Sequence, residues 1–191
     1  MQVNYILYLE GKEESFSGSS DYLLGEQMSE RIIEYISRPV KEGCFVKYRV
    51  DDDLEKFDNE VRAYQVLYPF GLCPKLLNCG YQEFRCYNVG EQEEFILYGY
   101  YIETELFGIS LHERFPCPYS DGAGSNSLEA IKDIHAYFYY PEEVNEKIKH
   151  VLEGMHELGV VHDDMHGGNL LIGEGAQIKV IDFELVSFRS V

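Results

Sequence analysis

Basic residues are scarce in this chain: 16 lysines and arginines stand against 34 aspartates and glutamates, so the formal net charge is −18 at pH 7. A surface this negative repels phosphate backbones and anionic headgroups instead of releasing counterions from them. We therefore expect neither nucleic acid nor a membrane surface as a partner. The same field attracts cations, whether Mg²⁺, a basic protein or an amine-bearing small molecule.

Paired cysteines and long apolar runs are also missing. The five cysteines include no C-x-x-C pair, so neither a disulfide framework nor a standard structural zinc site is indicated. The sequence opens without a basic segment, and no apolar run approaches the roughly 18 residues that a membrane helix requires. We expect a soluble, unprocessed, cytoplasmic protein with reduced thiols, whose 191 residues form one domain or two tightly joined lobes.

The first half of the chain is rich in strand-forming residues. Aromatic and β-branched residues cluster between turn residues and predict strands over residues 3–9, 44–50, 76–82 and 95–106. Residues 53–68 instead predict a helix, because apolar side chains recur there at spacings of three and four, at Leu54, Phe57, Val61, Tyr64 and Leu67. Residues 25–37 fit either period, and we favour a strand.

The second half begins with a Pro/Gly/Ser-rich stretch at 116–127, which predicts a surface loop between two lobes. A helix is predicted over 141–158, opened by Pro141 and ended by Gly159, with a single apolar face. Two short strands, 170–172 and 178–181, follow with a glycine-containing turn between them, which indicates a hairpin.

Polar residues interrupt these apolar strands. Asp164 and Asn169 stand five positions apart before the hairpin, and Asp182 follows it directly. Two carboxylates and an amide placed in this way can converge on a divalent cation and on a hydroxyl nucleophile. Phosphoryl transfer needs that arrangement, because its catalysis consists mostly of positioning and of charge neutralisation by Mg²⁺.

The segment resembles the catalytic loop and the metal-binding motif of the protein kinase-like superfamily. His162, Asp164 and Asn169 match the pattern H-x-D-x-x-x-x-N, and Asp182 matches the first residue of D-F-G, which reads D-F-E here. The resemblance implies that Asp164 is the catalytic base, that Asn169 and Asp182 hold Mg²⁺, and that His162 is structural.

Two neighbouring positions depart from the usual protein kinase pattern. Asp163 stands where most relatives carry Arg or Gly, and His166 stands where Ser/Thr kinases usually carry Lys. Together with the D-F-E ending, His166 gives the loop the style of aminoglycoside and choline kinases. His166 has two interpretations, contact with a phosphate or a cap on the loop, and we favour the cap.

Upstream segments extend the resemblance. Residues 44–48 are similar to the strand whose lysine, here Lys47, pairs with the α- and β-phosphates of ATP, and residues 57–64 to the helix that supplies its partner, Glu60. Residues 101–111 are similar to the hinge, where the backbone of Glu105, Leu106 and Phe107 would bind adenine. The nearest counterpart of the glycine-rich phosphate loop is 25–32, which keeps one glycine of three, Gly25.

The resemblance implies an α+β fold with two lobes and ATP between them. The N-lobe, about 1–107, would be an antiparallel sheet with one helix, and the C-lobe, about 108–191, would be shortened and mainly helical. Only nine residues follow Asp182, so we expect the activation segment and the peptide-holding helices to be missing. Substrate capture would then differ from that of protein kinases or depend on an activating protein partner.

The implied activity is ATP- and Mg²⁺-dependent phosphorylation of a hydroxyl, with protein Ser/Thr favoured over a small molecule of the aminoglycoside or choline type. A pseudokinase or regulatory binding module that acts through a partner remains an alternative, because the glycines are depleted. A further alternative is a transition-metal hydrolase site, built from His162, Asp163, Asp164 and His166.

Overall fold

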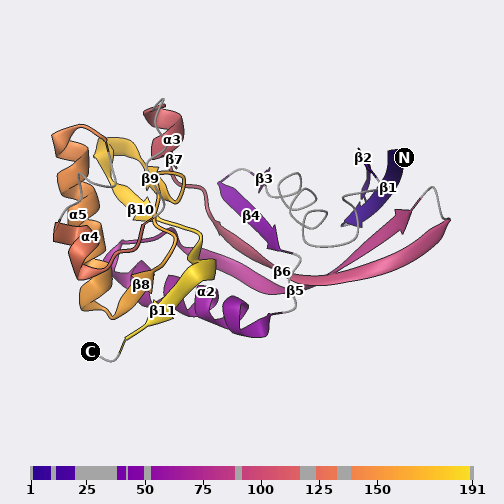
Figure 1. Cartoon of the computed structure of the whole chain (residues 1–191), viewed down its shortest axis with the longest axis horizontal. Helices are drawn as coiled ribbons and strands as arrows, with labels where there is room; N and C mark the ends of the chain where they lie inside the picture. The colour runs from indigo at the N-terminus through magenta and orange to yellow at the C-terminus, as the bar shows by residue number, and fades with distance from the viewer. Residues whose placement is uncertain are drawn as a thin grey trace. The chain divides into compact units, whose positions relative to one another are not determined.

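Two compact units emerge from the computed structural model, the first within Met1–Leu54 and Leu77–Thr104 and the second within Glu55–Leu76 and Glu105–Val191 (Figure 1). Gly25 and the segment 25–37, for which a strand was favoured, lie outside the described residues. The residues that the structure describes are 2–9, 12–19, 38–41, 43–49, 53–88, 92–116, 124–132 and 139–189.

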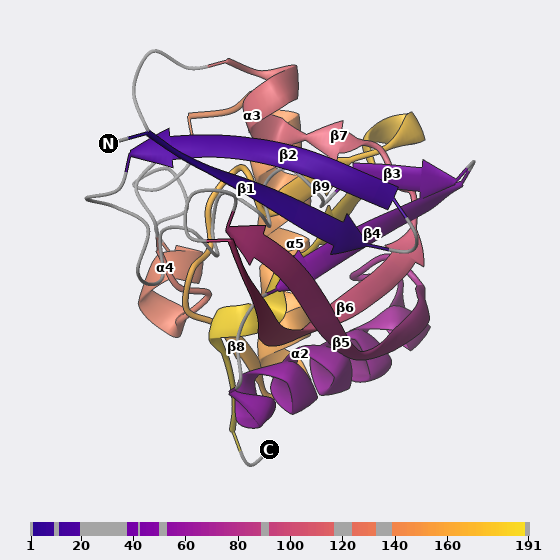
Figure 2. The ribbon, with the colours of Figure 1, turned by 90° about the vertical axis from the view of Figure 1, so that its right-hand side faces the viewer.

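Unit 1 contains a six-stranded sheet with the order β2-β1-β5-β6-β4-β3 (Figure 2). The pairs β1–β2, β1–β5 and β3–β4 are antiparallel. All four predicted strands are present, as β1, β4, β5 and β6. The other two were not predicted, because one is polar with no apolar alternation and the other is four residues long and contains a proline. The strands are β1 (Gln2–Leu9), β2 (Lys12–Ser19), β3 (Arg38–Lys41), β4 (Cys44–Arg49), β5 (Leu76–Asn88) and β6 (Glu93–Glu105).

Aromatic side chains pack on one face of this sheet. The ring of Tyr48 meets Phe84 edge-on at 6.0 Å between centroids and lies 6.3 Å from Tyr101. A Cβ atom at Gly80 would stand 3.2 Å from the Tyr101 ring, so glycine lets that ring lie across β5. Lys47 alternates with the buried Val46 and Tyr48, which places it on the opposite face of β4, where it is half-buried.

Unit 2 includes α2 (Leu54–Leu67), the predicted helix, but its buried face differs from the expected stripe. Leu54 is 57% exposed and Val61 is half-buried, whereas Glu60 is fully buried. The expected stripe included only apolar residues, so it left out Glu60, whose carboxylate is on the buried side of the helix. Buried charges in proteins are paired, and Glu60 does interact within the chain. The buried residues are Phe57, Glu60, Ala63, Tyr64 and Leu67.

The second predicted helix is α5 (Glu142–Glu157), and its apolar face is buried as expected. Gly159 follows with φ +71°, the left-handed conformation that ends helices, so this prediction is confirmed. Among the described residues, the short helices α3 (Leu111–Arg114) and α4 (Leu128–Lys132) lie before α5 in the chain. The helix α5 lies against β8, which leads into the loop described below, and against β10, which leads to Asp182 (Figure 1).

Short antiparallel strands complete unit 2. The predicted hairpin is present as β9 (Leu170–Ile172) and β10 (Ile178–Val180), and β7 (Ile109–Ser110) extends it on the other side of β9. A separate pair joins β8 (Val160–His162) to β11 (Val186–Phe188). The segment with the polar residues, 163–169, therefore connects two different small sheets.

The expected surface loop at 116–127 is wrong at its C-terminal end. Gly124 forms an isolated antiparallel bridge with Met165, and Asn126 is fully buried. The Asn126 amide donates to Val160 O at 3.0 Å, and its oxygen accepts the His162 N–H at 2.8 Å. Residues 117–123 lie outside the described residues, so the loop prediction is not tested there. At 124–127 the chain is irregular, and a loop whose polar groups are satisfied by β8 can be buried.

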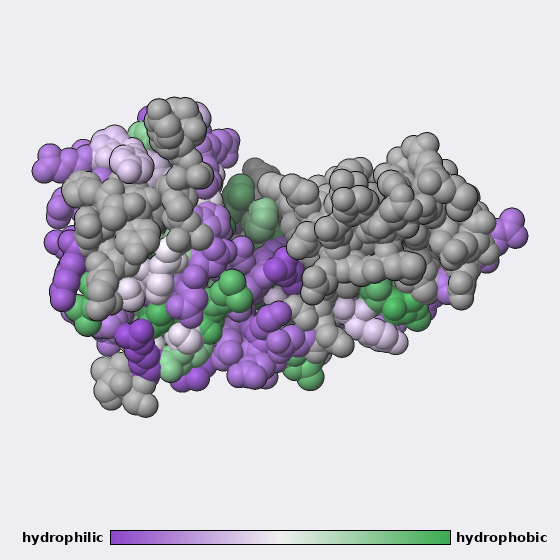
Figure 3. Space-filling view, in the orientation of Figure 1, coloured by the Kyte–Doolittle hydropathy of each residue, from purple (hydrophilic) through white to green (hydrophobic). Residues whose placement is uncertain are grey.

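The fold class is therefore α+β, with an antiparallel N-terminal sheet followed by a set of helices and short strands, as a shortened kinase-like fold requires. Among the described residues, none of the helices combines the length and the apolar character needed to cross a bilayer. Hydrophilic side chains cover much of the described surface in the view of Figure 3, in agreement with the acidic composition.

Candidate functional site

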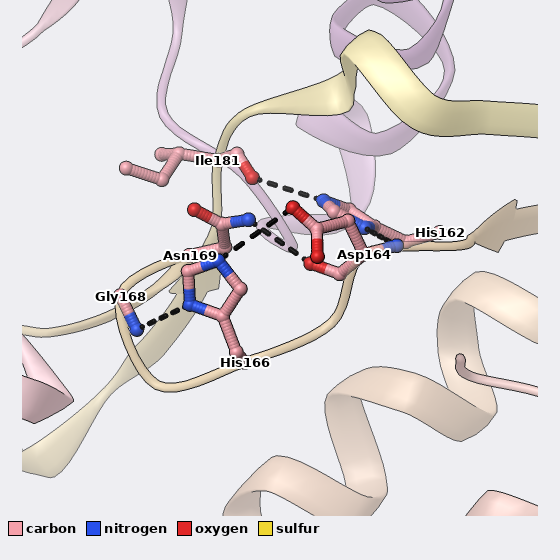
Figure 4. A network of polar contacts seen from close by, with 6 residues as sticks. All are labelled: His162, Asp164, His166, Gly168, Asn169 and Ile181. Atoms are coloured by element: carbon pink, nitrogen blue, oxygen red, sulfur yellow. Dashed lines mark hydrogen bonds and ion pairs between the residues drawn. The ribbon is translucent and has the colours of Figure 1, made fainter. Parts of the chain in front are cut away.

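His162 joins the two segments of unit 2 that carry the predicted site residues. Its Nε2 lies 3.2 Å from Ile181 O, and its Nδ1 accepts the backbone N–H of Asp164 at 3.2 Å (Figure 4). These bonds assign the neutral ring with its proton on Nε2. Burial lowers the pKa of His162, and the nearby Ile181 carbonyl and the Asp182 and Asp164 carboxylates only partly oppose that effect. The expectation of a structural histidine is met.

Asp164 and Asn169 lie on the loop between β8 and β9, and Asp182 lies on the neighbouring segment that follows β10. The Asn169 side-chain amide donates to Asp164 O at 3.0 Å, which ties the two ends of the loop together. The N–H of Ile181 donates to Asn169 O at 3.0 Å, which brings Asp182 next to the loop. In Figure 4 the side-chain oxygen of Asn169 points away from Asp164, so it faces away from the bonds that fix the loop.

Asp182 has a strained backbone. Its φ of 65° and ψ of 64° place it in the left-handed region, which costs an ordinary residue on the order of 1 kcal/mol. Strain that the surrounding structure maintains is a feature of functional sites. The strained position is Asp182 and not Glu184, whose φ is not positive, so the glycine of D-F-G can be replaced here by glutamate without backbone conflict.

Phe183 connects this segment to α2. The ring is fully buried, meets Tyr64 edge-on at 4.9 Å and lies 5.5 Å from the His162 ring. Cys73 supports the same helix through a contact of 3.6 Å from its Sγ to Tyr64 O. Burial raises the pKa of Cys73 to about 12, so this thiol stays protonated and acts as an apolar core group.

The oxygen atoms of this loop suit Mg²⁺. Carboxylate and amide oxygens are the hard ligands that this ion prefers, and it usually takes one or two protein carboxylates together with substrate phosphates. Asn169 and Asp182 offer that combination beside the half-buried Asp164. Within the part of the chain that the structure describes, no three His, Cys, Asp or Glu side chains gather as a metal cluster. Both ring nitrogens of His162 are engaged by backbone groups, which speaks against its service as a ligand in the transition-metal hydrolase alternative.

The predicted hinge is fixed to the hairpin by its side chains. Lys179 of β10 lies 2.7 Å from Glu105 Oε1 and 4.3 Å from the centre of the Phe107 ring. Burial alone would raise the pKa of Glu105, but the Lys179 hydrogen bond and the Lys75 backbone and charge hold it below its ordinary value. With Glu105 and Phe107 engaged in this way and Leu106 exposed, adenine contact through the hinge backbone stays a prediction.

The remaining predicted residues are distributed over the two units. Lys47 belongs to β4 in unit 1, whereas Glu60, like the loop residues, belongs to unit 2. The predicted pairing of Lys47 with Glu60 therefore stays a prediction, as does phosphate contact by Gly25, which lies outside the described residues.

Sequence reasoning missed the partners of Asp163 and the stacking of His112. The Asp163 carboxylate accepts hydroxyl hydrogen bonds from Ser125 and Ser187, both at 3.3 Å. His112 of α3 stacks on His166 with 5.7 Å between ring centroids. These contacts join residues far apart in the sequence, so no local sequence pattern predicts them.

Comparison with known proteins shows partial sequence similarity to protein kinases. The chain is 34% identical to mitogen-activated protein kinase HOG1 of Hortaea werneckii over 89 residues. The aligned stretch covers 47% of this chain and 20% of the relative. The chain is also 33% identical over 85 residues to mitogen-activated protein kinase mpkC of Emericella nidulans, covering 44% of this chain and 17% of that one. The chain thus spans about a fifth of the length of these curated relatives. No protein-family profile matches it. Nearly half of the chain is therefore similar in sequence to protein kinases.

Proposed function

We propose that this chain is an ATP- and Mg²⁺-dependent phosphotransferase of the protein kinase-like superfamily that phosphorylates Ser/Thr hydroxyls of proteins. The similarity to mitogen-activated protein kinases supports the protein acceptor. The observation that carries the proposal is the pair of hydrogen bonds that joins Asn169 to Asp164 and Ile181 to Asn169. These bonds support the proposal because they connect the backbone at Asp164, Asn169 and Ile181, beside Asp182, the residues to which the proposal assigns the base and the cation ligands.

Each residue has a distinct role in the proposal. Asp164 accepts the proton of the acceptor hydroxyl as its oxygen forms a bond to the γ-phosphorus and the bond from that phosphorus to the β,γ-bridging oxygen breaks. Asn169 and Asp182 would hold Mg²⁺, which neutralises charge on the phosphates when bound. Lys47, with Glu60 as its partner, would bind the α- and β-phosphates, and the backbone of 105–107 would bind adenine.

The direct test measures ATP consumption at saturating Mg²⁺ with an acceptor mixture, for the wild type and for Asp164→Asn. Loss of a positioned general base costs about 100-fold or more in rate, so we expect the variant to fall by at least that factor. Asp163→Asn is the matched control, since it removes the adjacent charge, and Asp163 binds serine hydroxyls at the edge of the loop.

Equal rates for wild type and Asp164→Asn would remove the proposal. Two acceptor pools separate the substrate classes: a protein fraction of a lysate and a metabolite extract cleared of protein. Phosphate transfer to serine or threonine in the first pool supports the protein acceptor. Transfer only in the second pool would identify a small-molecule kinase.

A further inference from the structure

We propose that His166 is a positioning residue for Asp164: its Nε2–H fixes the orientation of the Asp164 carboxylate, and His112 and Gly168 hold the imidazole in place. This inference rests on the proposed function for its kinetic consequence. The contact between the His166 and Asp164 side chains can be measured without any turnover.

The backbone of Asp164 is already fixed from both sides. Its N–H donates to His162 Nδ1, and its carbonyl oxygen accepts from the Asn169 amide. The carboxylate rotates about a terminal bond whose torsional preference is broad, so these backbone bonds leave its direction open. A base must present an oxygen to the acceptor hydroxyl within about 2.6–3.2 Å, and a separate contact is needed to fix the carboxylate.

His166 is placed to make that contact, because its Nε2 faces the Asp164 carboxylate from just beyond hydrogen-bond distance and a small rotation of the carboxylate would complete the bond. Its Nε2 lies 3.6 Å from Asp164 Oδ2, and its Nδ1 accepts the N–H of Gly168 at 3.0 Å (Figure 4). Because Nδ1 accepts this bond, the ring proton is on Nε2, which faces the carboxylate. The cap on the loop that the sequence favoured for His166 is therefore present, and it also orients the opposite nitrogen of the ring toward Asp164.

Two further residues restrict the ring of His166. The ring of His112 lies nearly parallel to it, with 16° between their planes, and the backbone N–H of His112 donates to Gly167 O at 3.3 Å. A Cβ atom at Gly168 would come within 2.7 Å of His166 Cε1 and 3.4 Å of His112 Nδ1. Glycine at 168 therefore leaves just enough room for the imidazole in this orientation.

Two amide substitutions separate a positioning role from a simple cap. In His166→Asn the side-chain oxygen can still accept the Gly168 N–H, as Nδ1 does, but the side chain is too short to reach Asp164. In His166→Gln the terminal amide nitrogen takes the place of Nε2 and can donate to the carboxylate. His150→Gln, on the exposed side of α5, is the matched control for a histidine-to-amide change.

We expect kcat to fall about 10- to 100-fold in His166→Asn, with KM for ATP unchanged, because a displaced base slows the transfer without altering nucleotide binding. His166→Gln should retain most of kcat. A fully active Asn variant, or a Gln variant as slow as Asn, would overturn the inference, because either result assigns His166 to the cap alone.

Nuclear magnetic resonance provides a readout that needs neither nucleotide nor activity. The ¹⁵N shifts of the His166 ring should identify the Nε2–H tautomer, and the ¹³C shift of the Asp164 carboxylate should change in His166→Asn but not in His166→Gln. Gly168→Ala should lose the tautomer signature. A wild-type ring protonated on Nδ1 alone would refute the positioning role. Absence of turnover in the wild type would instead refute the proposed function and leave this result standing.

Discussion

At the scale of single residues, the charge state of His162 is linked to the stability of unit 2. The ring is fully buried, and Nδ1 accepts a backbone N–H while Nε2 faces a carbonyl oxygen. A second proton would have to enter on Nδ1, where it would meet the N–H of Asp164. The folded protein therefore favours the neutral ring, in agreement with the lowered pKa of His162. The free energy of unfolding is reduced by this preference only under acid conditions.

The sign of the pH dependence follows from this preference. The unfolded chain binds a proton at His162 below its ordinary pKa of 6.5, whereas the folded chain does so only at a lower pH. The contribution of His162 to the free energy of unfolding is therefore complete above pH 6.5 and decreases as the pH falls through the interval down to the lowered value. Urea unfolding at pH 7.5 and pH 5.5, without Mg²⁺, measures this loss.

A substitution isolates the contribution of His162 from that of the other titratable groups. His162→Gln removes the titration, so the stability difference between the two pH values should shrink relative to wild type. In His150→Gln, where the histidine is exposed, the difference should remain close to wild type. An unchanged pH dependence in His162→Gln would contradict this assignment.

At the scale of elements, the loop 163–169 is held mainly by contacts with segments distant in the sequence. Asn126 fixes β8 through two buried hydrogen bonds, to Val160 O and from the His162 N–H. The exposed Asp163 carboxylate adds Ser125 on one side and Ser187 of β11 on the other. These contacts fix the start of the loop, at β8 and Asp163, and connect it to β11, which follows Asp182 in the chain.

Asn126→Ala should be strongly destabilising. It leaves a buried carbonyl and a buried N–H of β8 without their partners, and each such loss costs about 1–3 kcal/mol. We expect a decrease of about 2–5 kcal/mol in the free energy of unfolding, measured by urea titration. Ser125→Ala, which removes one hydroxyl contact with an exposed carboxylate, should change stability by less than about 1 kcal/mol. Similar losses in both variants would show that Asn126 does not anchor β8.

Gly108, between the predicted hinge and β7, has little room for any side chain. Its φ is +50°, and a Cβ atom there would overlap the Ile172 carbonyl of β9. Gly71 has a similar φ of +72° but open space around it. Gly71→Ala should therefore cost only the conformational strain of about 1–2 kcal/mol, whereas Gly108→Ala should cost clearly more, because backbone must move. Equal decreases in melting temperature would contradict this reading.

Several elements follow directly from the sequence, and others could not have been foreseen. The helix α5 has apolar residues at helical spacing, a proline before its first turn and a glycine after its last, so local physics determines it. The hairpin β9–β10 is equally local. The buried Glu60 and Asn126, the Asp163–serine contacts and the His112–His166 stack are not, because each depends on which distant segment packs against it. For Asp164 and Asn169 the spacing in the sequence was sufficient, since two residues five positions apart on one loop can meet, and the Asn169 amide does donate to Asp164 O.

At the scale of the whole molecule, net charge sets a condition on nucleotide binding. A chain with a net charge of −18 repels a polyanion such as ATP. Binding at physiological salt, where the Debye length is about 8 Å, then depends on cations close to the phosphates. In the proposed function these are Mg²⁺ and Lys47, so the contribution of Lys47 should exceed that of a lysine elsewhere on the surface.

Lys47→Met tests this condition against Lys132→Met, which makes the same change in net charge at an exposed position of α4. A ligand at 100 times its Kd adds about 2.7 kcal/mol to the free energy of unfolding, which corresponds to roughly 5–10 °C in Tm for a chain of this size. We expect ATP·Mg to produce such a shift in the wild type and in Lys132→Met, and to lose most of it in Lys47→Met. Equal shifts in the two variants would exclude Lys47 from phosphate binding. A full shift in the wild type without any ATP consumption would identify a nucleotide-binding regulatory module, because binding would then be separated from transfer.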